Sequence, residues 1–261
     1  MNKREVADMS NYYFAPNTSY DDKLKQVECI GQHEFLLPFV GRDYDEYRVL
    51  QIAESRYLYD CRFTPQEIAE VYTSWFEGEH KKISELHHDN VDTRSMFERY
   101  LSHTENYKGW AFPNFAAAVA KGLGVNKSRE NVNYCAFMNF YQLPFAAHGK
   151  DNGMNYANFK RVLMPALEVK AVDELWNKCC REAVETVNAV VEILQPNLIF
   201  FTSIHAYNQY RYYTEEFGLK RYDSIRLYHS SDSRVWNRTI AGQSNSSAQI
   251  VEERVKALKN K

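Results

Sequence analysis

The sequence has 261 residues and a mass of 30.7 kDa, with 44% hydrophobic and 25% charged residues. These are ordinary values for a globular protein, so they exclude a mainly disordered chain and a collagen-like or coiled-coil rod. The 32 Lys and Arg residues against 34 Asp and Glu give a net charge of −2. This balance excludes a histone-like coat of positive charge, but it leaves room for a local basic groove.

The cysteines indicate a reducing compartment. Their number is odd, and no Cys-x-x-Cys occurs among Cys29, Cys61, Cys135, Cys179 and Cys180. We therefore expect reduced thiols and a cytoplasmic protein, without a four-cysteine iron–sulfur or zinc site. No run approaches about 18 apolar residues and the first residues contain no apolar stretch, so we expect neither a transmembrane helix nor a signal peptide.

The chain is predicted to form one α/β domain, residues 46–261, preceded by a polar, tyrosine-rich N-terminal wrap over residues 1–45. The first apolar run, residues 48–53, predicts a buried strand. Thr64, with Pro65 next and Glu67 three residues on, is typical of a helix start. Residues 78–108 are polar and predict a long surface excursion.

Later segments alternate between short apolar runs and amphipathic stretches. Asn114 predicts the cap of a short helix, and Pro196 ends the clearest helix of the chain. Further strands are predicted at residues 132–138, 198–201 and 225–228, further helices at 115–121, 173–194, 203–217 and 248–258, and an irregular segment at 145–172.

Strands that alternate with helices and carry continuous apolar runs predict a parallel sheet covered on both faces. In such sheets, ligands bind beyond the carboxyl ends of the strands. The segments that follow the four predicted strands are Glu54–Tyr57, Asn139–Gln142, Thr202–His205 and His229–Ser231.

Four segments resemble the uracil-DNA glycosylase superfamily, and in particular bacterial members whose first strand ends in Gly-Glu-Ser or Gly-Glu-Ala. Their order and spacing agree with the family over most of residues 38–240. The segments are Pro38–Gly41 with VLQIAESRYL at 49–58, Phe112–Phe115, AFMNFYQLP at 136–144, and Leu194–Phe200 followed by Tyr228–Ser231.

The resemblance implies a three-layer α/β/α sandwich around a four-stranded, mostly parallel sheet. It also implies a pocket for a base that is flipped out of DNA. Flipping costs a few kcal/mol, which stacking and hydrogen bonds to the Watson–Crick edge recover. No cofactor is implied, and the expected partner is DNA that contains uracil or damage.

The same resemblance assigns base recognition to Asn139 and stabilisation of the departing base to His229. An amide offers one donor and one acceptor, so Asn139 can pair with uracil O4 and N3–H together. A donor from His229 at uracil O2 would stabilise the negative charge that builds there. The alternatives are an asparagine that bonds its own turn and a histidine with an ordinary partner at a strand end.

Phe112, with Phe140 as the second choice, is the expected stacking residue. Stacking contributes roughly 1–3 kcal/mol per base. Tyr57 follows the first predicted strand, in the loop that the resemblance assigns to base binding, and is a further candidate for contact with the base. The alternative is that these rings belong to the core, since the chain contains 15 Phe.

Glu54 and Ser55 occupy the loop that positions water in the family, and here the sequence departs from the pattern. Ala53 replaces the usual glycine, which makes a tight backbone approach harder. Ser55 stands where the best-known branch has its water-orienting aspartate, and serine is not a general base unaided. Glu54 could substitute for it, or could instead form an ion pair with Arg56 or Arg48.

The loop after the last motif is the expected DNA contact, because an arginine beside an apolar wedge suits the minor groove. It includes Ser230, Ser231, Arg234, Trp236 and Arg238. The alternative is a set of exposed charges around a packed tryptophan. Lys220, Arg221 and Arg226 make the region the most basic stretch of the chain.

Two weaker signals carry no prediction. His87-His88-Asp89 could bind a metal, but it lies in a polar excursion, so no metal site is predicted. His229 with Asp232 and a nearby serine has the composition of a hydrolase triad, yet all its members lie on one loop, whereas triads assemble from separate elements.

Two functions follow from this pattern. The first is a uracil-DNA glycosylase-like protein that binds a nucleobase or damaged DNA and hydrolyses an N-glycosidic bond. The second is the same fold without this chemistry, acting as a binding module for nucleic acid, a nucleotide or a protein; the departures at Ala53 and Ser55 and the acidic net charge favour it. A third class, an unrelated small-molecule hydrolase, is the weakest.

Overall fold

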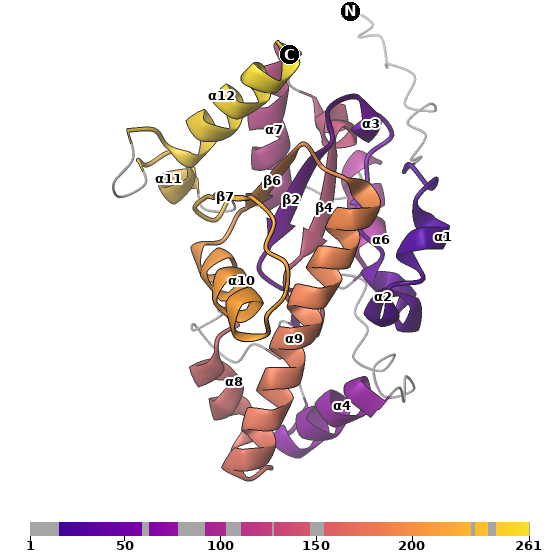
Figure 1. The fold of residues 1–261 in the computed structure, drawn as a ribbon, viewed down its shortest axis with the longest axis vertical. Coiled ribbons are helices and arrows are strands. Elements are labelled where there is room, and N and C mark those ends of the chain that lie inside the picture. The colour runs from indigo at the N-terminus through magenta and orange to yellow at the C-terminus, as the bar shows by residue number, and fades with distance from the viewer. Residues whose placement is uncertain are drawn as a thin grey trace, which may run out of the picture.

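The computed structural model describes residues 16–58, 63–77, 92–102, 111–126, 128–146, 154–230, 233–239 and 244–260. Its centre is a five-stranded sheet in the order β1-β4-β2-β6-β7 (Figure 1). The strands are β1 Phe39–Val40, β2 Val49–Ala53, β4 Cys135–Asn139, β6 Leu198–Phe201 and β7 Ile225–Arg226. A second, two-stranded sheet pairs β3, Tyr57–Leu58, with β5, Phe145–Ala146.

The predicted α/β class with a mostly parallel sheet is confirmed. Strands β4, β2, β6 and β7 run parallel, as expected from the strand–helix alternation. The predicted strand number is wrong, because β1 adds a fifth strand that pairs antiparallel with β4, Phe39 opposite Phe137. This strand comes from the N-terminal segment. Both edges of the sheet, β1 and β7, are strands of only two residues.

Helices cover both faces of the sheet. Helix α9 crosses one face, and α7 with α12 lies at the other (Figure 1). The helices are α1 Asp21–Leu24, α2 Glu28–Gln32, α3 Tyr44–Tyr47, α4 Pro65–Glu77, α6 Thr93–Leu101, α7 Ala111–Leu123, α8 Tyr156–Leu163, α9 Val169–Leu194, α10 Ile204–Glu216, α11 Ser233–Trp236 and α12 Ser247–Lys259, with 3₁₀ turns at Glu34–Leu36 and Arg129–Tyr134.

Each face has its own core. Leu50 and Ile52 of β2 point to the face that α2, α4, α8, α9 and α10 cover. Val49 and Ala53 belong to clusters formed with α6, α7 and α12 on the opposite face. The alternation along β2 follows from the pleat of a strand. It determines which candidate side chains lie on the same face and can contact one another.

The predicted caps of α4 and α10 are confirmed, whereas part of the predicted surface excursion is helical. Thr64 and Glu67 form the expected reciprocal cap at α4, and the Ser203 side chain accepts from Ala206 N at α10. Within the expected surface excursion, residues 92–102 instead contain α6, whose Phe97 and Leu101 are buried. Asn114 lies inside α7 rather than at its start.

Glu182 of α9 is a titratable group in the packing between helices. Both carboxylate oxygens accept from the Trp75 indole N–H of α4, at 2.9 and 3.1 Å. Burial raises the pKa of Glu182 to about 7, although the hydrogen bonds from Trp75 and the Cys29 thiol act in the opposite direction. Between about pH 4.5 and pH 7, the folded state therefore keeps a proton on Glu182 that the unfolded chain has released.

We expect this carboxyl to lower stability as the pH rises from about 4.5 to about 7, because its folded pKa lies above its unfolded one. Glu182→Gln should remove this component, so the variant gains about 2 kcal/mol relative to wild type between pH 4 and pH 8, a figure reduced for the partial exposure of the side chain. Urea unfolding at both pH values measures it. Glu174→Gln, at an exposed position of the same helix, is the control, and an equal stability difference at both pH values would contradict the assignment.

Candidate functional site

The carboxyl ends of the four parallel strands bring separated chain segments to one edge of the sheet. Glu54 follows β2, Ser203 follows β6, and the two side chains meet directly. Ser203 Oγ donates to Glu54 Oε2 at 2.6 Å, and the backbone N–H of Met154 donates to Glu54 Oε1 at 3.1 Å. His205 Nε2 lies 2.8 Å from Met154 O. The Glu54 carboxylate is thus anchored between the start of α10 and the segment that precedes α8.

A second polar group lies on the opposite face of the sheet, under α7. Gln51 Nε2 of β2 donates to Thr202 Oγ1 at 3.1 Å and reaches Ser230 Oγ at 3.5 Å. Asn114 of α7 donates to Ser230 O at 2.5 Å. Gln51, Thr202 and Ser230 are buried, so this group fixes the loop after β7 against the centre of the sheet.

Asn139 lies on the same face as this second group. It is the last residue of β4, is in register with Ala53, and is 5% exposed. Alternation along β4 puts it on the side of Phe137, which packs with α7, whereas Glu54 bonds to partners on the other side. The structure therefore brings Asn139 and Ser230, which lies in the loop after β7, to one face of the sheet. Glu54 lies on the other face.

A buried arginine supports the turn after β4. Arg56 donates to Thr93 Oγ1 and to Gln142 Oε1, the latter at 3.5 Å. Gln142 in turn donates to the backbone oxygen of Asn139 at 2.6 Å. Burial lowers the pKa of Arg56 to about 10. These hydrogen bonds fix the position of the Asn139 backbone.

Phe112, the predicted stacking residue, is enclosed by aromatic rings of the protein. It is 3% exposed, and its ring centroid lies 4.2 Å from that of Phe97 and 5.2 Å from that of Tyr100. Phe140, the second choice, is fully buried. Neither ring presents an open face to a base in this arrangement, so stacking on Phe112 requires the neighbouring rings to move.

The remaining predicted residues of the base-binding loop are only partly defined. The hydroxyl of Ser55 is buried and has no hydrogen-bond partner among the described residues. Tyr57 contributes its backbone to β3, opposite Phe145, and its side chain lies outside the described part. His229 is half-buried directly before Ser230.

The expected DNA-contact loop is divided between core and surface. Trp236, at the end of α11, is 4% exposed and packs with α7 and α12. This is the packed tryptophan of the alternative interpretation, because α12 closes over the ring. Arg238 is exposed. Ser231 and the side chain of Arg234 lie outside the described residues.

Sequence reasoning missed the inner members of the site. Gln51 was passed over as part of an apolar strand, although a polar amide in the middle of a buried strand is itself a signal that it must find a partner. Met154 lies in a segment that was predicted to be irregular, and its contribution is a backbone N–H, which leaves no trace in residue type.

The described residues contain no group of three His, Cys, Asp or Glu side chains that could hold a metal ion; His87-His88-Asp89 lies outside them. Cys29, Cys135, Cys179 and Cys180 are free thiols, and burial raises the pKa of each. Cys61 lies outside the described residues. Among the helices described, none has the length and apolar character needed to span a membrane.

Comparisons with known protein families, with curated proteins and with solved structures find no match. Functional assignment therefore depends on the geometry and chemistry of the chain itself.

Proposed function

We propose that the protein is uracil-DNA glycosylase-like and binds a nucleobase or damaged DNA at the carboxyl edge of its sheet. One observation carries the proposal: hydrogen-bonding side chains from four distant segments gather at this edge. Under α7, Gln51 donates to Thr202 and reaches Ser230, and Asn114 donates to the backbone oxygen of Ser230. Asn139 ends its strand on the same face.

Asn139 is the proposed base-recognition residue. Its backbone is fixed by Gln142, which limits the reorganisation needed before the amide can bind a ligand. An amide that donates and accepts at once fits the Watson–Crick edge of a pyrimidine. Ser230 reaches this face from the loop after β7. His229 directly precedes it, and the glycosylase resemblance makes His229 the proposed donor to the base oxygen as the glycosidic bond breaks.

Glu54 is the proposed acceptor for the attacking water. The two hydrogen bonds that it receives from Ser203 and Met154 fix the position of its carboxylate, as a general base requires. Its orientation away from Asn139 supports the second candidate function, a binding module that holds a base without cleaving it. Serine at position 55 supports the same candidate.

The chemical test is base release from single-stranded DNA that contains uracil. For a glycosylase, we expect release by the wild type and a loss of at least about 100-fold in rate for Asn139→Ala and for His229→Ala, the scale seen when one preorganised donor is removed. Asn197→Ala is the matched control, because Asn197 is an exposed asparagine before β6, at the opposite edge of the sheet.

The two candidate functions give different results. Binding of the oligonucleotide without release of any base, weakened by Asn139→Ala but not by Asn197→Ala, would assign the protein as a binding module. The absence of both binding and release would contradict both functions and favour a small-molecule hydrolase. Circular dichroism of each variant separates a lost contact from a lost fold.

A further inference from the structure

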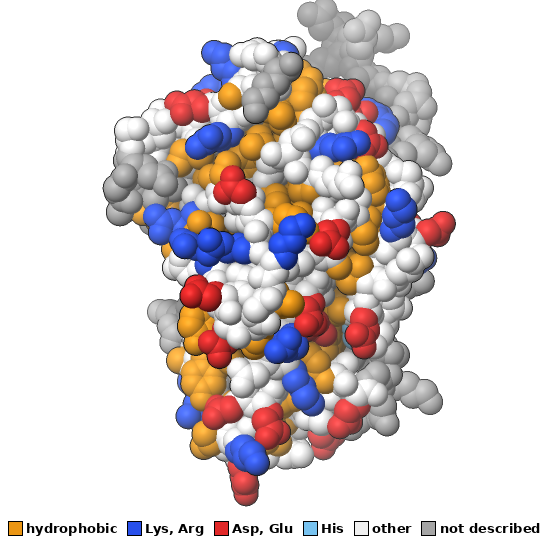
Figure 2. Space-filling view, in the orientation of Figure 1, with side chains coloured by type: hydrophobic (Ala, Val, Ile, Leu, Met, Phe, Trp, Pro, Cys, Tyr) orange, Lys and Arg blue, Asp and Glu red, His pale blue; other side chains and the backbone are white. Residues whose placement is uncertain are grey.

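A basic surface away from the carboxyl edge lies where α10 meets the segment that leads into β7. Figure 2 shows Lys and Arg side chains gathered on this face between α11 and α10. A cavity of about 360 Å³ opens here. It is lined by Tyr207, Arg211, Arg221, Tyr222, Asp223 and Ser224.

The two guanidinium groups in this cavity are available for a ligand. Arg211 and Arg221 are exposed, and neither forms an ion pair with a described carboxylate. By contrast, Arg94 Nη2 lies 2.6 Å from Asp21 Oδ1. Asp223 also lines the cavity, so two cations and one anion leave one net positive charge.

Aromatic rings flank these charges. The Arg211 guanidinium lies over the Tyr207 ring, 5.7 Å from its centroid, as the i, i+4 spacing on one helix allows. On the other wall, Tyr222 is held by its backbone N–H, which donates to Tyr210 Oη at 3.0 Å, and by its hydroxyl, which donates to Glu192 at 2.7 Å. Arginines beside tyrosines are the composition of surfaces that bind single-stranded nucleic acid.

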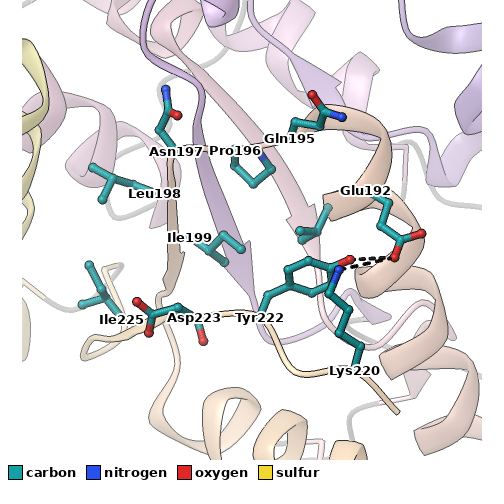
Figure 3. A pocket seen from close by; sticks show the side chains of 12 residues that line it. Glu192, Gln195, Pro196, Asn197, Leu198, Ile199, Lys220, Tyr222, Asp223 and Ile225 are labelled. Atoms are coloured by element: carbon teal, nitrogen blue, oxygen red, sulfur yellow. Dashed lines mark hydrogen bonds and ion pairs between the residues drawn. The ribbon is translucent and has the colours of Figure 1, made fainter. Parts of the chain in front are cut away.

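The larger neighbouring cavity, about 680 Å³, is less suited to an anion (Figure 3). It shares residues 222–224 with the basic cavity and lies toward the amino ends of β6 and β7. Its lysine, Lys220, faces Glu192 at 3.9 Å and covers the Tyr222 ring. The positive charge there is already neutralised, whereas that of Arg211 and Arg221 is not.

A single helix connects the basic cavity to the Glu54 side of the carboxyl edge. Ser203, which caps α10, bonds to Glu54 at the carboxyl edge. Arg211 lies eight residues further along, which corresponds to about 12 Å of helix. Helix α10 therefore joins the basic cavity to the Glu54 side of the carboxyl edge, on the face opposite Asn139.

We propose that Arg211 and Arg221 bind phosphate groups of single-stranded DNA, with Tyr207 and Tyr222 as walls of the cavity. The inference rests on the proposed function for its choice of ligand. It assigns a second contact area to the strand, separate from the residues that recognise the base.

The test measures binding of a fluorescent oligothymidylate of about ten nucleotides, within the usual range of site sizes, by anisotropy at several salt concentrations. For Arg211→Gln/Arg221→Gln we expect about tenfold weaker binding at physiological salt and a salt slope smaller by about 1.4, because each phosphate contact to a single strand contributes about 0.7. Arg254→Gln/Lys256→Gln, two exposed positions of α12, is the control with the same change in net charge.

The probe contains no uracil, so this test is independent of base recognition. A loss confined to the Arg211/Arg221 variant supports the inference even if uracil brings no gain in affinity, a result that would count against the proposed function alone. Equal effects of both double variants, or no binding by the wild type, would overturn it. Binding of inorganic phosphate without binding of the oligonucleotide, followed by calorimetry, would also overturn it, since the ligand would then be a free anion.

Discussion

Replacing Phe97 with alanine is expected to lower the free energy of unfolding by about 3–5 kcal/mol, the range for a buried phenylalanine. The ring is 1% exposed and stacks on Phe39 with centroids 3.9 Å apart. It also contacts Phe112 and Phe137 at 4.2 and 5.4 Å. Phe97 thus joins α6 to β1, β4 and α7, and its removal leaves a cavity that these separate elements cannot all close.

Thermal or urea unfolding measures the change, and for a chain of this size we expect the melting temperature to fall by about 10 °C. Tyr212→Ala is the control, because this ring is 58% exposed and its loss should cost less than about 0.5 kcal/mol. Similar losses for both variants would show that the cluster around Phe97 is not packed as described.

Gly41→Ala is expected to destabilise the protein by about 3 kcal/mol, near the upper end for overpacking. Gly41 follows β1, and its N–H donates to Cys135 O at 2.9 Å. A Cβ added here would overlap the backbone oxygen and carbonyl carbon of Asn133. Backbone atoms cannot rotate away as a side chain can, so β1 would have to separate from the turn before β4.

Gly218→Ala is the matched control, measured by the same unfolding experiment. Gly218 has φ +63°, but an added Cβ meets nothing within 4 Å, so only backbone strain of about 1–2 kcal/mol is expected. If Gly41→Ala costs no more than Gly218→Ala, the close approach of the two backbone segments is refuted.

The central strands could be predicted because each is an apolar run with a clear boundary. The run 198–201 begins after Pro196, and the structure has β6 at Leu198–Phe201. β1 could not be predicted in this way, since two residues, Phe39 and Val40, carry no periodicity. Helix α6 was missed although the sequence carries its signals: Asp92 caps its start, and Met96, Phe97, Tyr100 and Leu101 recur at helical spacing.

The sequence predicted that the candidate residues lie at the carboxyl edge of the sheet, but not which of their side chains contact one another. Parallel topology alone predicts Glu54, Asn139, Ser203 and Ser230 at strand ends. The structure has the first three there, whereas Ser230 lies four residues beyond the end of β7. Which side chains meet depends on strand register, and register depends on contacts between distant residues such as Ala53 and Asn139. The sequence therefore gave no warning that Glu54 and Asn139 point to opposite faces.

The two-residue strands at both margins of the sheet have a consequence for behaviour at high concentration. A long, flat margin is a template on which another chain can add a strand, and this is the usual start of aggregation. Here the pairing groups of β2 and β6 are enclosed between neighbours, and β7 offers only Ile225 and Arg226 to an incoming chain. The charge of Arg226 adds a further obstacle, so we expect intermolecular strand addition to start from unfolded chains rather than from the native sheet.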